Sequence, residues 1–397
     1  ILERLKKQDK RQPTMGAEGS KESNAKKHSL VKRQNIDQRV VTAFNAISQG
    51  GETVSSKHFT ERFGEDLGSN LWKYLSDSAS EKWQMDLAHF GLHFFSLIGT
   101  STDQYVEILL PPEQMLRVCA QCATGEYLRE EDEDFLHVLL AHMEKAGNSP
   151  AALTNWKNEY CSRLCDAVQT RVMSTLNLFS APALTDYGSD VLSTLQMWFI
   201  HCSLPQIYLP KSKAGEGDSS SLCWTPLYSS LQQGISVTRF EANVFDYRGP
   251  TVTIFRLKDG ALTVLAADEE WRNSGSMFGS VDSVFMQLLP EFRRIQKSSS
   301  IYCNFKLRNF PMKLTFDRYL CIDAEMNEVL AVEVFGCSGT QTLQEQQKIK
   351  QWQRRQIEKN KKVPLPGKWD DNPDKFILEL GGVYSTDNRR EVYRRDD

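Results

Sequence analysis

The stretch TVTIFRLKDGALTVLA, residues 251–266, contains two segments rich in β-branched and apolar residues. They flank Lys258-Asp-Gly260, and an Asp-Gly pair can occupy the positive-φ positions of a tight hairpin turn. The stretch therefore predicts two antiparallel strands, 251–257 and 262–266, joined by a short turn.

Short segments of the same character continue on both sides of this hairpin, from Trp224 to Cys337. Each is bounded by turn residues, which is typical of an antiparallel β core. The last contains VEVFGC at residues 332–337. We expect a two-sheet antiparallel sandwich with further strands at 284–289, 301–305, 313–316, 319–322 and 329–335.

The sequence before the β region has a helical pattern. Apolar residues return there at three- and four-residue steps, as in Val40, Phe44 and Ile47. The segment KSKAGEGDSSS, which ends at Ser221, is polar and contains glycine, as linkers do. The chain is thus predicted to be α+β, with an arm at 1–33, a helical domain at 34–205, a linker at 206–221, a β domain at 222–339 and a basic helix with a tail at 340–397.

Metal-binding patterns in the helical domain are incomplete. Paired helices around Val54 indicate an EF-hand-like region, but the loop 77–88 has Ala79 and Lys82 where an oxygen ligand and the turn glycine belong, so we expect it to be calcium-free. His89 and His93 share a helix face without the glutamate of a zinc-protease motif. We interpret this pair as structural or surface residues and expect no metal or other cofactor.

The nine cysteines follow no regular framework, which favours reduced thiols and an intracellular location. The pairs Cys119/Cys122 and Cys161/Cys165 invite a zinc interpretation. Both lie in helix-like sequence, where small thiols pack as apolar side chains, and we predict core packing instead.

Composition narrows the class of protein. The 397 residues are 40% apolar and carry a formal net charge of −3, which suits a globular chain and disfavours a dedicated nucleic-acid binder. No apolar run approaches the ~20 residues that span a bilayer, so any membrane contact is expected to be peripheral.

The first 33 residues are basic and poor in large apolar side chains, which predicts a disordered arm. The arm contains MGAEGSK, which fits the N-myristoylation pattern at Gly16 if Met15 is the true start. A chance match to this short pattern is the alternative. One acyl chain binds membranes weakly, and the lysines of the arm are expected to supply a modest second signal.

The segment 340–362 has strong helix formers and an excess of basic residues, which predicts a long basic helix. It has too few apolar positions for burial on all sides. Two interpretations remain open, a partner-binding helix and a solvated helix without a partner. The predicted partner-binding residues are Lys348, Trp352, Arg354, Arg355, Lys359 and Lys361.

The β region resembles the TLDc domain family. The residues that carry the resemblance are the opening Trp224–Ser230, the Gly-Pro entry into a strand at Tyr247–Val252, the strand with its downstream tryptophan at Leu262–Trp271, the strand Phe285–Leu289 and the closing Val332–Gly336. The order of Met15-Gly16, the segment VSSKHF at 54–59 and Leu204-Pro205 is similar to the mTOR-associated subfamily at the lysosome surface.

One departure from the family pattern is visible, because Leu320–Asp323 runs almost directly into Val329. The second half of the domain is therefore expected to be abbreviated. Two explanations remain open, a loop and strand edge that are absent by design, or an incomplete gene prediction.

The resemblance implies a non-enzymatic adaptor on the cytosolic face of lysosomes or endosomes. Its implied partners are the vacuolar-type proton pump and mTOR signalling components, with a link to oxidative-stress resistance. One alternative is a thiol-based antioxidant enzyme using Cys303, Cys321 or Cys337, with Arg318 near Cys321, although the β region has no histidine to act as a base. Another is a peripheral lipid-binding protein.

Overall fold

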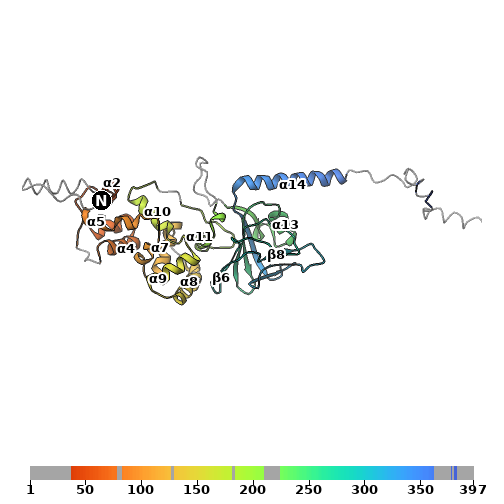
Figure 1. Ribbon diagram of the computed structural model, residues 1–397, viewed down its shortest axis with the longest axis horizontal. Helices are drawn as coiled ribbons and strands as arrows, with labels where there is room; N and C mark the ends of the chain where they lie inside the picture. The colour runs from red at the N-terminus through yellow and green to blue at the C-terminus, as the bar shows by residue number, and fades with distance from the viewer. Residues whose placement is uncertain are drawn as a thin grey trace, which may run out of the picture. The chain divides into compact units, whose positions relative to one another are not determined.

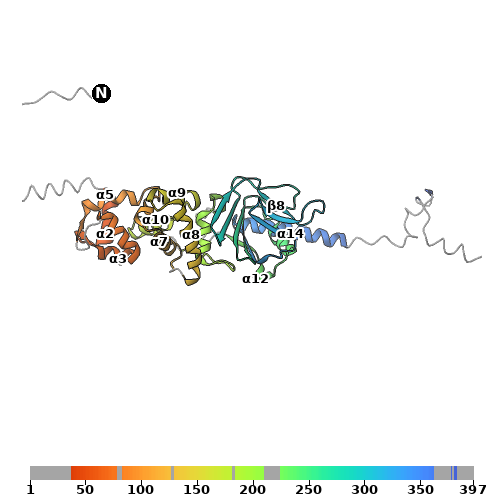
Figure 2. The ribbon, with the colours of Figure 1, turned by 90° about the horizontal axis from the view of Figure 1, so that it is seen from below.

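The computed structural model describes residues 37–77, 83–126, 129–180, 184–209 and 224–361, together with 377, 380 and 381 (Figures 1 and 2). The predicted arm with Gly16 lies outside these residues. The described chain divides into two compact units, the first ending at Leu204 and the second beginning at Pro205. No helix of the described chain has both the length and the apolar composition that a membrane crossing requires.

The first unit is helical, as predicted. Its elements are α2 (Gln38–Ser48), β1 (Thr53–Val54), α3 (Ser56–Phe63), α4 (Glu65–Leu75), β2 (Met85–Asp86), α5 (Leu87–Leu97), α6 (Gln104–Ile108), α7 (Pro112–Thr124), the 3-10 helix η1 (Glu130–Asp132), α8 (Glu133–Ala146), α9 (Pro150–Tyr160), α10 (Asp166–Thr175) and α11 (Thr194–Ser203).

Local sequence signals explain where several of these helices begin. The Ser149 hydroxyl accepts a hydrogen bond from the backbone N–H of Ala152 at the start of α9, where Pro150 occupies the first helical position. At the start of α11, Ser193 and Gln196 form a reciprocal capping box. The short strand β1 lies between α2 and α3, and β2 lies between α4 and α5. The two strands pair in antiparallel register, with Val54 opposite Met85.

The second unit contains two antiparallel sheets with helices. Its elements are the 3-10 helix η2 (Gln206–Tyr208), β3 (Thr225–Ser229), α12 (Ser230–Gln233), α13 (Val237–Val244), β4 (Thr251–Leu257), β5 (Leu262–Ala267), β6 (Val284–Leu289), β7 (Arg293–Gln296), β8 (Ile301–Asn304), β9 (Lys313–Phe316), β10 (Leu320–Asp323), β11 (Val329–Gly336) and α14 (Gly339–Lys361). The strand order is β3-β11-β4-β5-β6-β7 in the larger sheet and β10-β9-β8 in the smaller.

The predicted β4–β5 hairpin is confirmed, with Thr251 opposite Ala267 and Arg256 opposite Leu262. Its turn differs from the prediction in one respect. Within this turn only Gly260 takes a left-handed φ, +87°. The Asp259 carboxylate instead accepts a hydrogen bond from the Ala261 N–H at 2.9 Å, which stabilises the turn from its side chain.

In this unit the other predicted strands are found with small shifts in their ends, and one strand of the unit was missed. β10 begins one residue later than predicted, at Leu320, and β8 ends one residue earlier, at Asn304. The missed strand, β7, has the sequence RRIQ and lies at the edge of the larger sheet. Such a polar segment lacks the apolar alternation that predicts strands, and its pairing with β6 decides its conformation.

A common core joins the two sheets and α13. Phe285 of β6 stacks on Phe316 of β9, with ring centroids 5.5 Å apart. Phe240 of α13 meets Trp271 edge-on at 5.5 Å. The indole N–H of Trp271 donates to the Thr251 hydroxyl at 2.7 Å, so this buried polar group is satisfied.

The connection between β10 and β11 is short, as the sequence shows. Asp323 closes it by accepting hydrogen bonds from the backbone N–H of Asn327 at 2.8 Å and from its amide at 2.6 Å. Met326 turns inward and is 2% exposed. The chain therefore passes directly from β10 of the smaller sheet to β11, which lies between β3 and β4 in the larger one.

Candidate partner-binding site on helix α14

The first half of α14 is fixed to the second unit through Gln346. Its amide donates to the carbonyls of Asn243 and Phe245, both at 2.9 Å, and the residue is 2% exposed. These carbonyls lie at the C-terminal end of α13, where a helix has no internal partners for its last C=O groups. Leu343 packs against the apolar core one turn earlier. Gln346 thus links the first half of α14 to the end of α13, about 100 residues earlier in the sequence.

Lys350 continues this anchored side of the helix. Its ammonium lies 3.4 Å from the Asn243 carbonyl, and burial lowers its pKa. Sequence reasoning counted Lys350 only among the basic residues of the helix and did not single out Gln346. Their spacing from Leu343, three and seven residues, is the signal that places them on the apolar side.

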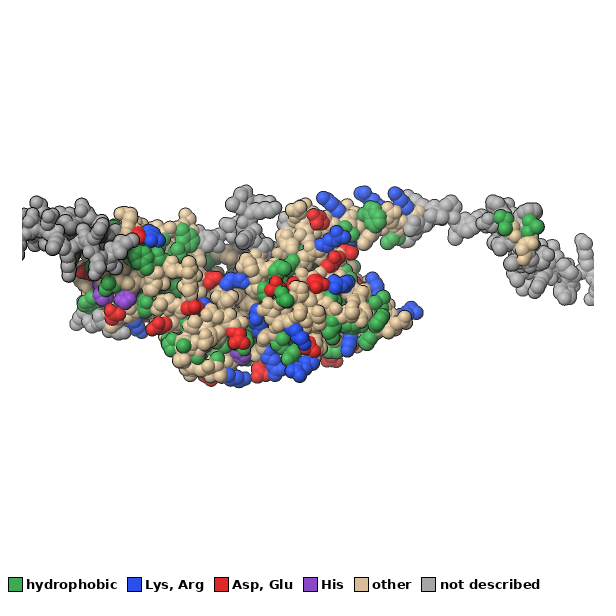
Figure 3. Space-filling model, in the orientation of Figure 1, with side chains coloured by type: hydrophobic (Ala, Val, Ile, Leu, Met, Phe, Trp, Pro, Cys, Tyr) green, Lys and Arg blue, Asp and Glu red, His purple; other side chains and the backbone are tan. Residues whose placement is uncertain are grey.

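The second half of α14 extends past the sheets (Figures 1 and 2). Trp352 is 62% exposed and Ile357 is 55% exposed. The predicted residues Lys348, Arg354, Arg355 and Lys359 are exposed as well, whereas the side chain of Lys361 lies outside the described atoms. Figure 3 shows basic and apolar side chains together on this part of the helix.

Helical spacing divides the predicted residues between two sides. Four of them recur at steps of four, three and four residues and therefore form one stripe. We call this the basic stripe, and its members are Lys348, Trp352, Arg355 and Lys359. Ile357 lies on the opposite side, in line with Gln346 and Lys350, and Arg354 lies between the two sides. From the sequence alone, all the predicted residues of α14 formed one set.

The basic stripe keeps its positive charge. Between Gly339 and Lys361, α14 carries six basic residues and two acidic ones. Within the described part of the chain, no ion pair involves Lys348, Arg355 or Lys359. An aromatic ring among unneutralised cations suits binding to an acidic protein surface.

Residues 186–350 match the family model of the TLDc domain. The chain contains a TLDc domain. The match reaches beyond the predicted 222–339 at both ends, taking in α11 upstream and the anchored first half of α14 downstream. The exposed second half of α14, including Trp352, lies beyond the matched residues. Among curated proteins no match to the chain was found.

The thiols proposed for the antioxidant alternative differ in their environments. Cys303 and Cys337 of the TLDc domain are buried, and burial raises the pKa of both thiols. Cys321 is exposed on β10. The Arg318 guanidinium lies 5.2 Å from the ring centroid of Tyr319 and donates to the hydroxyl of that ring. Of the three thiols, Cys321 is the accessible one.

The cysteines of the helical unit are core residues except Cys122, which is only partly buried. Cys119, Cys161, Cys165 and Cys202 are buried, and the sulfur atoms of Cys119 and Cys165 lie 3.9 Å apart. Burial raises the pKa of the Cys119 and Cys202 thiols. Among the described residues, no three cysteines bring their sulfur atoms close enough to hold one metal ion. The predicted core packing is confirmed for Cys119, Cys161 and Cys165.

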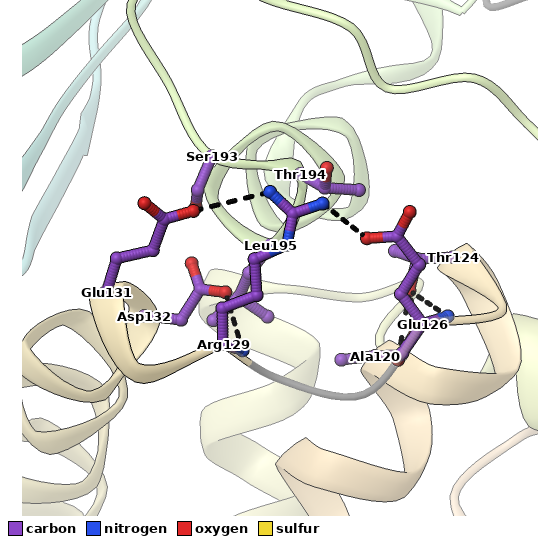
Figure 4. Close-up of a pocket in the computed structure, with 9 residues that line it drawn as sticks. All are labelled: Ala120, Thr124, Glu126, Arg129, Glu131, Asp132, Ser193, Thr194 and Leu195. Atoms are coloured by element: carbon purple, nitrogen blue, oxygen red, sulfur yellow. Dashed lines mark hydrogen bonds and ion pairs between the residues drawn. The ribbon is translucent and has the colours of Figure 1, made fainter.

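A small pocket in the helical unit is filled by Arg129 (Figure 4). The guanidinium contacts Glu126 at 2.9 Å and Glu131 at 3.4 Å, while the Arg129 backbone N–H donates to Asp132. The remaining volume is about 10 Å³, enough for about one water molecule. The Arg129 guanidinium is already paired with two carboxylates, so we interpret this pocket as a structural ion-pair cluster.

Proposed function

We propose that the protein is a non-enzymatic adaptor whose TLDc domain presents α14 to a partner complex. The observation that carries the proposal is the division of this helix into an anchored first half and an exposed second half bearing the basic stripe. Tryptophan and arginine are the residues that contribute most often to binding energy at protein interfaces. Anchoring through Gln346 holds the helix in place before binding, which reduces the entropy lost on association.

The partner we propose first is the vacuolar-type proton pump, with mTOR signalling components as further partners. The resemblance of the TLDc region and of upstream segments to the mTOR-associated subfamily supports this choice. The positive charge of the basic stripe supports docking on an acidic face of such a complex. The proposed setting is the cytosolic face of lysosomes or endosomes, and the proposed outcome is resistance to oxidative stress.

The proposal also assigns roles to the helical unit and to the N-terminal arm. We propose that α2–α5 with the β1–β2 pair form an EF-hand-like, calcium-free region, an arrangement supported by two helix pairs joined through a two-stranded contact. Acylation of Gly16 would add a peripheral membrane contact, which is weak when a single chain acts alone. Liposome flotation with and without the acyl chain separates lipid binding from recruitment by a protein.

A pulldown of pump subunits from cell lysate tests the role of the basic stripe. We expect Trp352→Ala, and separately the pair Arg355→Glu with Lys359→Glu, to reduce recovery about tenfold or more, because such residues typically contribute over ~1.4 kcal/mol each at interface centres. The control is Lys258→Glu with Arg308→Glu, which makes the same charge change on exposed residues outside α14. Equal recovery by all four proteins would contradict the proposal.

The exposure of Cys321 favours one form of the enzymatic alternative. If the protein consumes peroxide through a β-domain thiol, Cys321→Ser is expected to abolish the activity while leaving pump recovery unchanged. Peroxide consumption that is lost in Cys321→Ser, together with no pump recovery by the unmodified chain, would favour the enzyme over the adaptor.

A further inference from the structure

Three side chains of the helical unit bring metal-ligating atoms together at the surface. Asp77 follows the end of α4 in a left-handed conformation, with φ of +49°. His89 and His93 lie one turn apart on α5, whose start is capped by the Asp86 carboxylate. The ligand atoms of these three residues all lie within 4.8 Å of one another. Histidine side chains are visible at the surface of this unit in Figure 3.

The separations are close to those of a metal site. One carboxylate oxygen of Asp77 lies 3.8 Å from Nε2 of His89, and the other lies 3.6 Å from Nε2 of His93. Ligand atoms at ~2.0–2.1 Å from a tetrahedral Zn²⁺ ion are about 3.3 Å apart. Small rotations of the side chains therefore suffice to place all three around one ion.

Neighbouring rings hold the two imidazoles in place. Trp83 meets His89 edge-on with ring centroids 4.8 Å apart, and Tyr74 meets His93 edge-on at 5.7 Å. The two histidine side chains are 26% and 28% exposed, and that of Asp77 is 66% exposed. An ion could therefore reach the cluster from solvent and keep water in its remaining coordination position.

We propose that Asp77, His89 and His93 form a site for a divalent first-row transition metal ion, with Zn²⁺ as the probe of choice. Two imidazoles and one carboxylate suit Zn²⁺, Co²⁺ or Ni²⁺, whereas Ca²⁺ and Mg²⁺ prefer oxygen ligands throughout. The bound ion ties the segment after α4 to α5. The sequence pattern did not indicate this site, because its third ligand, Asp77, comes from the end of another helix.

The same cluster has a simpler alternative, an ion pair between Asp77 and protonated imidazoles. Nε2 of His89 also lies 3.0 Å from the Leu75 carbonyl, a hydrogen bond that metal binding must replace. The two interpretations predict opposite effects of acid. Metal binding requires neutral imidazoles and weakens on acidification, whereas the ion pair requires charged ones and strengthens.

Zinc titration of the full chain, stripped with a chelator, tests the site. We expect the double variant His89→Ala with His93→Ala to bind one Zn²⁺ fewer per chain than the unmodified protein. Asp77→Asn keeps the shape of the side chain and is expected to weaken the same binding step about tenfold or more. The matched control His137→Ala removes an exposed helical histidine of α8 and is expected to bind as the unmodified chain does.

A Co²⁺ absorption spectrum and thermal unfolding provide readouts independent of stoichiometry. The visible band of four-coordinate Co²⁺ and a Zn²⁺-dependent rise in Tm are expected for the unmodified chain and for His137→Ala. Both are expected to be reduced in Asp77→Asn and lost in the double histidine variant. The band is expected to be weaker at about pH 5 than at about pH 7.5. Unchanged stoichiometry in the double histidine variant, or an unchanged band in Asp77→Asn, would overturn the proposal.

Discussion

His201 of α11 lies in a partly buried position beside the ring of Tyr187, with centroids 5.7 Å apart. Burial, followed by the positive charge of Arg163, lowers its pKa to about 4. In the unfolded chain an imidazole titrates at its ordinary value near 6.5. The unfolded state therefore binds a proton first as the pH falls, and the folded state loses stability between about pH 6.5 and 4.

The lowered pKa of His201 predicts that this residue makes the folded state less stable as the pH falls. Between pH 7.5 and pH 5 we expect His201 to lower the free energy of unfolding by about 2 kcal/mol. Urea unfolding at the two pH values measures the loss. His201→Gln, which cannot titrate, is expected to show a loss smaller by about that amount, and an identical loss in both proteins would contradict the assignment.

A buried lysine supplies a second prediction at this scale. Lys157 is 2% exposed, and its ammonium lies 2.7 Å from an Asp103 carboxylate oxygen and 3.1 Å from the Thr102 hydroxyl. Lys157 lowers the pKa of Asp103 through this hydrogen bond. Removing the carboxylate of such a pair leaves the buried ammonium without an opposite charge, which destabilises the folded state. Replacing the lysine by an apolar residue as well removes the buried charge and therefore its desolvation cost.

We therefore expect Asp103→Asn to destabilise the protein by about 2–3 kcal/mol, somewhat less than for a fully enclosed pair because Asp103 is 40% exposed. Lys157→Met combined with Asp103→Asn is expected to recover most of that loss. Chemical denaturation of both variants measures the difference. If the double variant is less stable than Asp103→Asn alone, the unpaired charge of Lys157 does not cause the loss of stability in Asp103→Asn.

At the scale of elements, α14 depends on contacts that its own sequence pattern does not reveal. Gln346→Ala removes both hydrogen bonds that its amide donates to the carbonyls of Asn243 and Phe245, which is expected to cost about 1–3 kcal/mol. Gln347→Ala, at the adjacent exposed position, changes the same residue type and is expected to cost less than about 0.5 kcal/mol.

Hydrogen exchange across residues 339–361 distinguishes the two glutamines. Faster exchange is expected in Gln346→Ala and not in Gln347→Ala, because only the former releases the helix from α13. Loss of the anchor is also expected to reduce pump recovery through lost preorganisation. Exchange that is unchanged in Gln346→Ala would show that Leu343 and its neighbours hold the helix without this side chain.

At the scale of the whole molecule, the second compact unit begins before its first strand. The ring of Tyr208 in η2 is fully buried, and its hydroxyl donates to the Asp282 carbonyl at 2.9 Å. The indole N–H of Trp224 donates to the Tyr208 carbonyl at 2.7 Å. A segment that the sequence assigned to the linker 206–221 thus contributes to the core of the TLDc region.

A fragment of residues 205–361 is therefore expected to be more stable than a fragment of residues 224–361, by about 2–4 kcal/mol from the burial of one aromatic ring and its hydrogen bonds. Denaturant unfolding of the two fragments measures this difference. Tyr208→Ala in the longer fragment is expected to remove most of the gain. Equal midpoints for the two fragments would show that the η2 segment adds no stability.

The sequence by itself predicted the α+β class, the β4–β5 hairpin and most strand positions, because apolar periodicity and turn residues are local properties. It missed β7, whose polar residues become a strand only through pairing with β6. It also predicted the exposed basic residues of α14 without separating the anchored side from the free one. Helical spacing can divide α14 into two sides, but the anchoring of one side on α13, the burial of Tyr208 and the meeting of Asp77 with His89 and His93 required the tertiary structure. Each of these joins residues whose proximity depends on how distant elements pack.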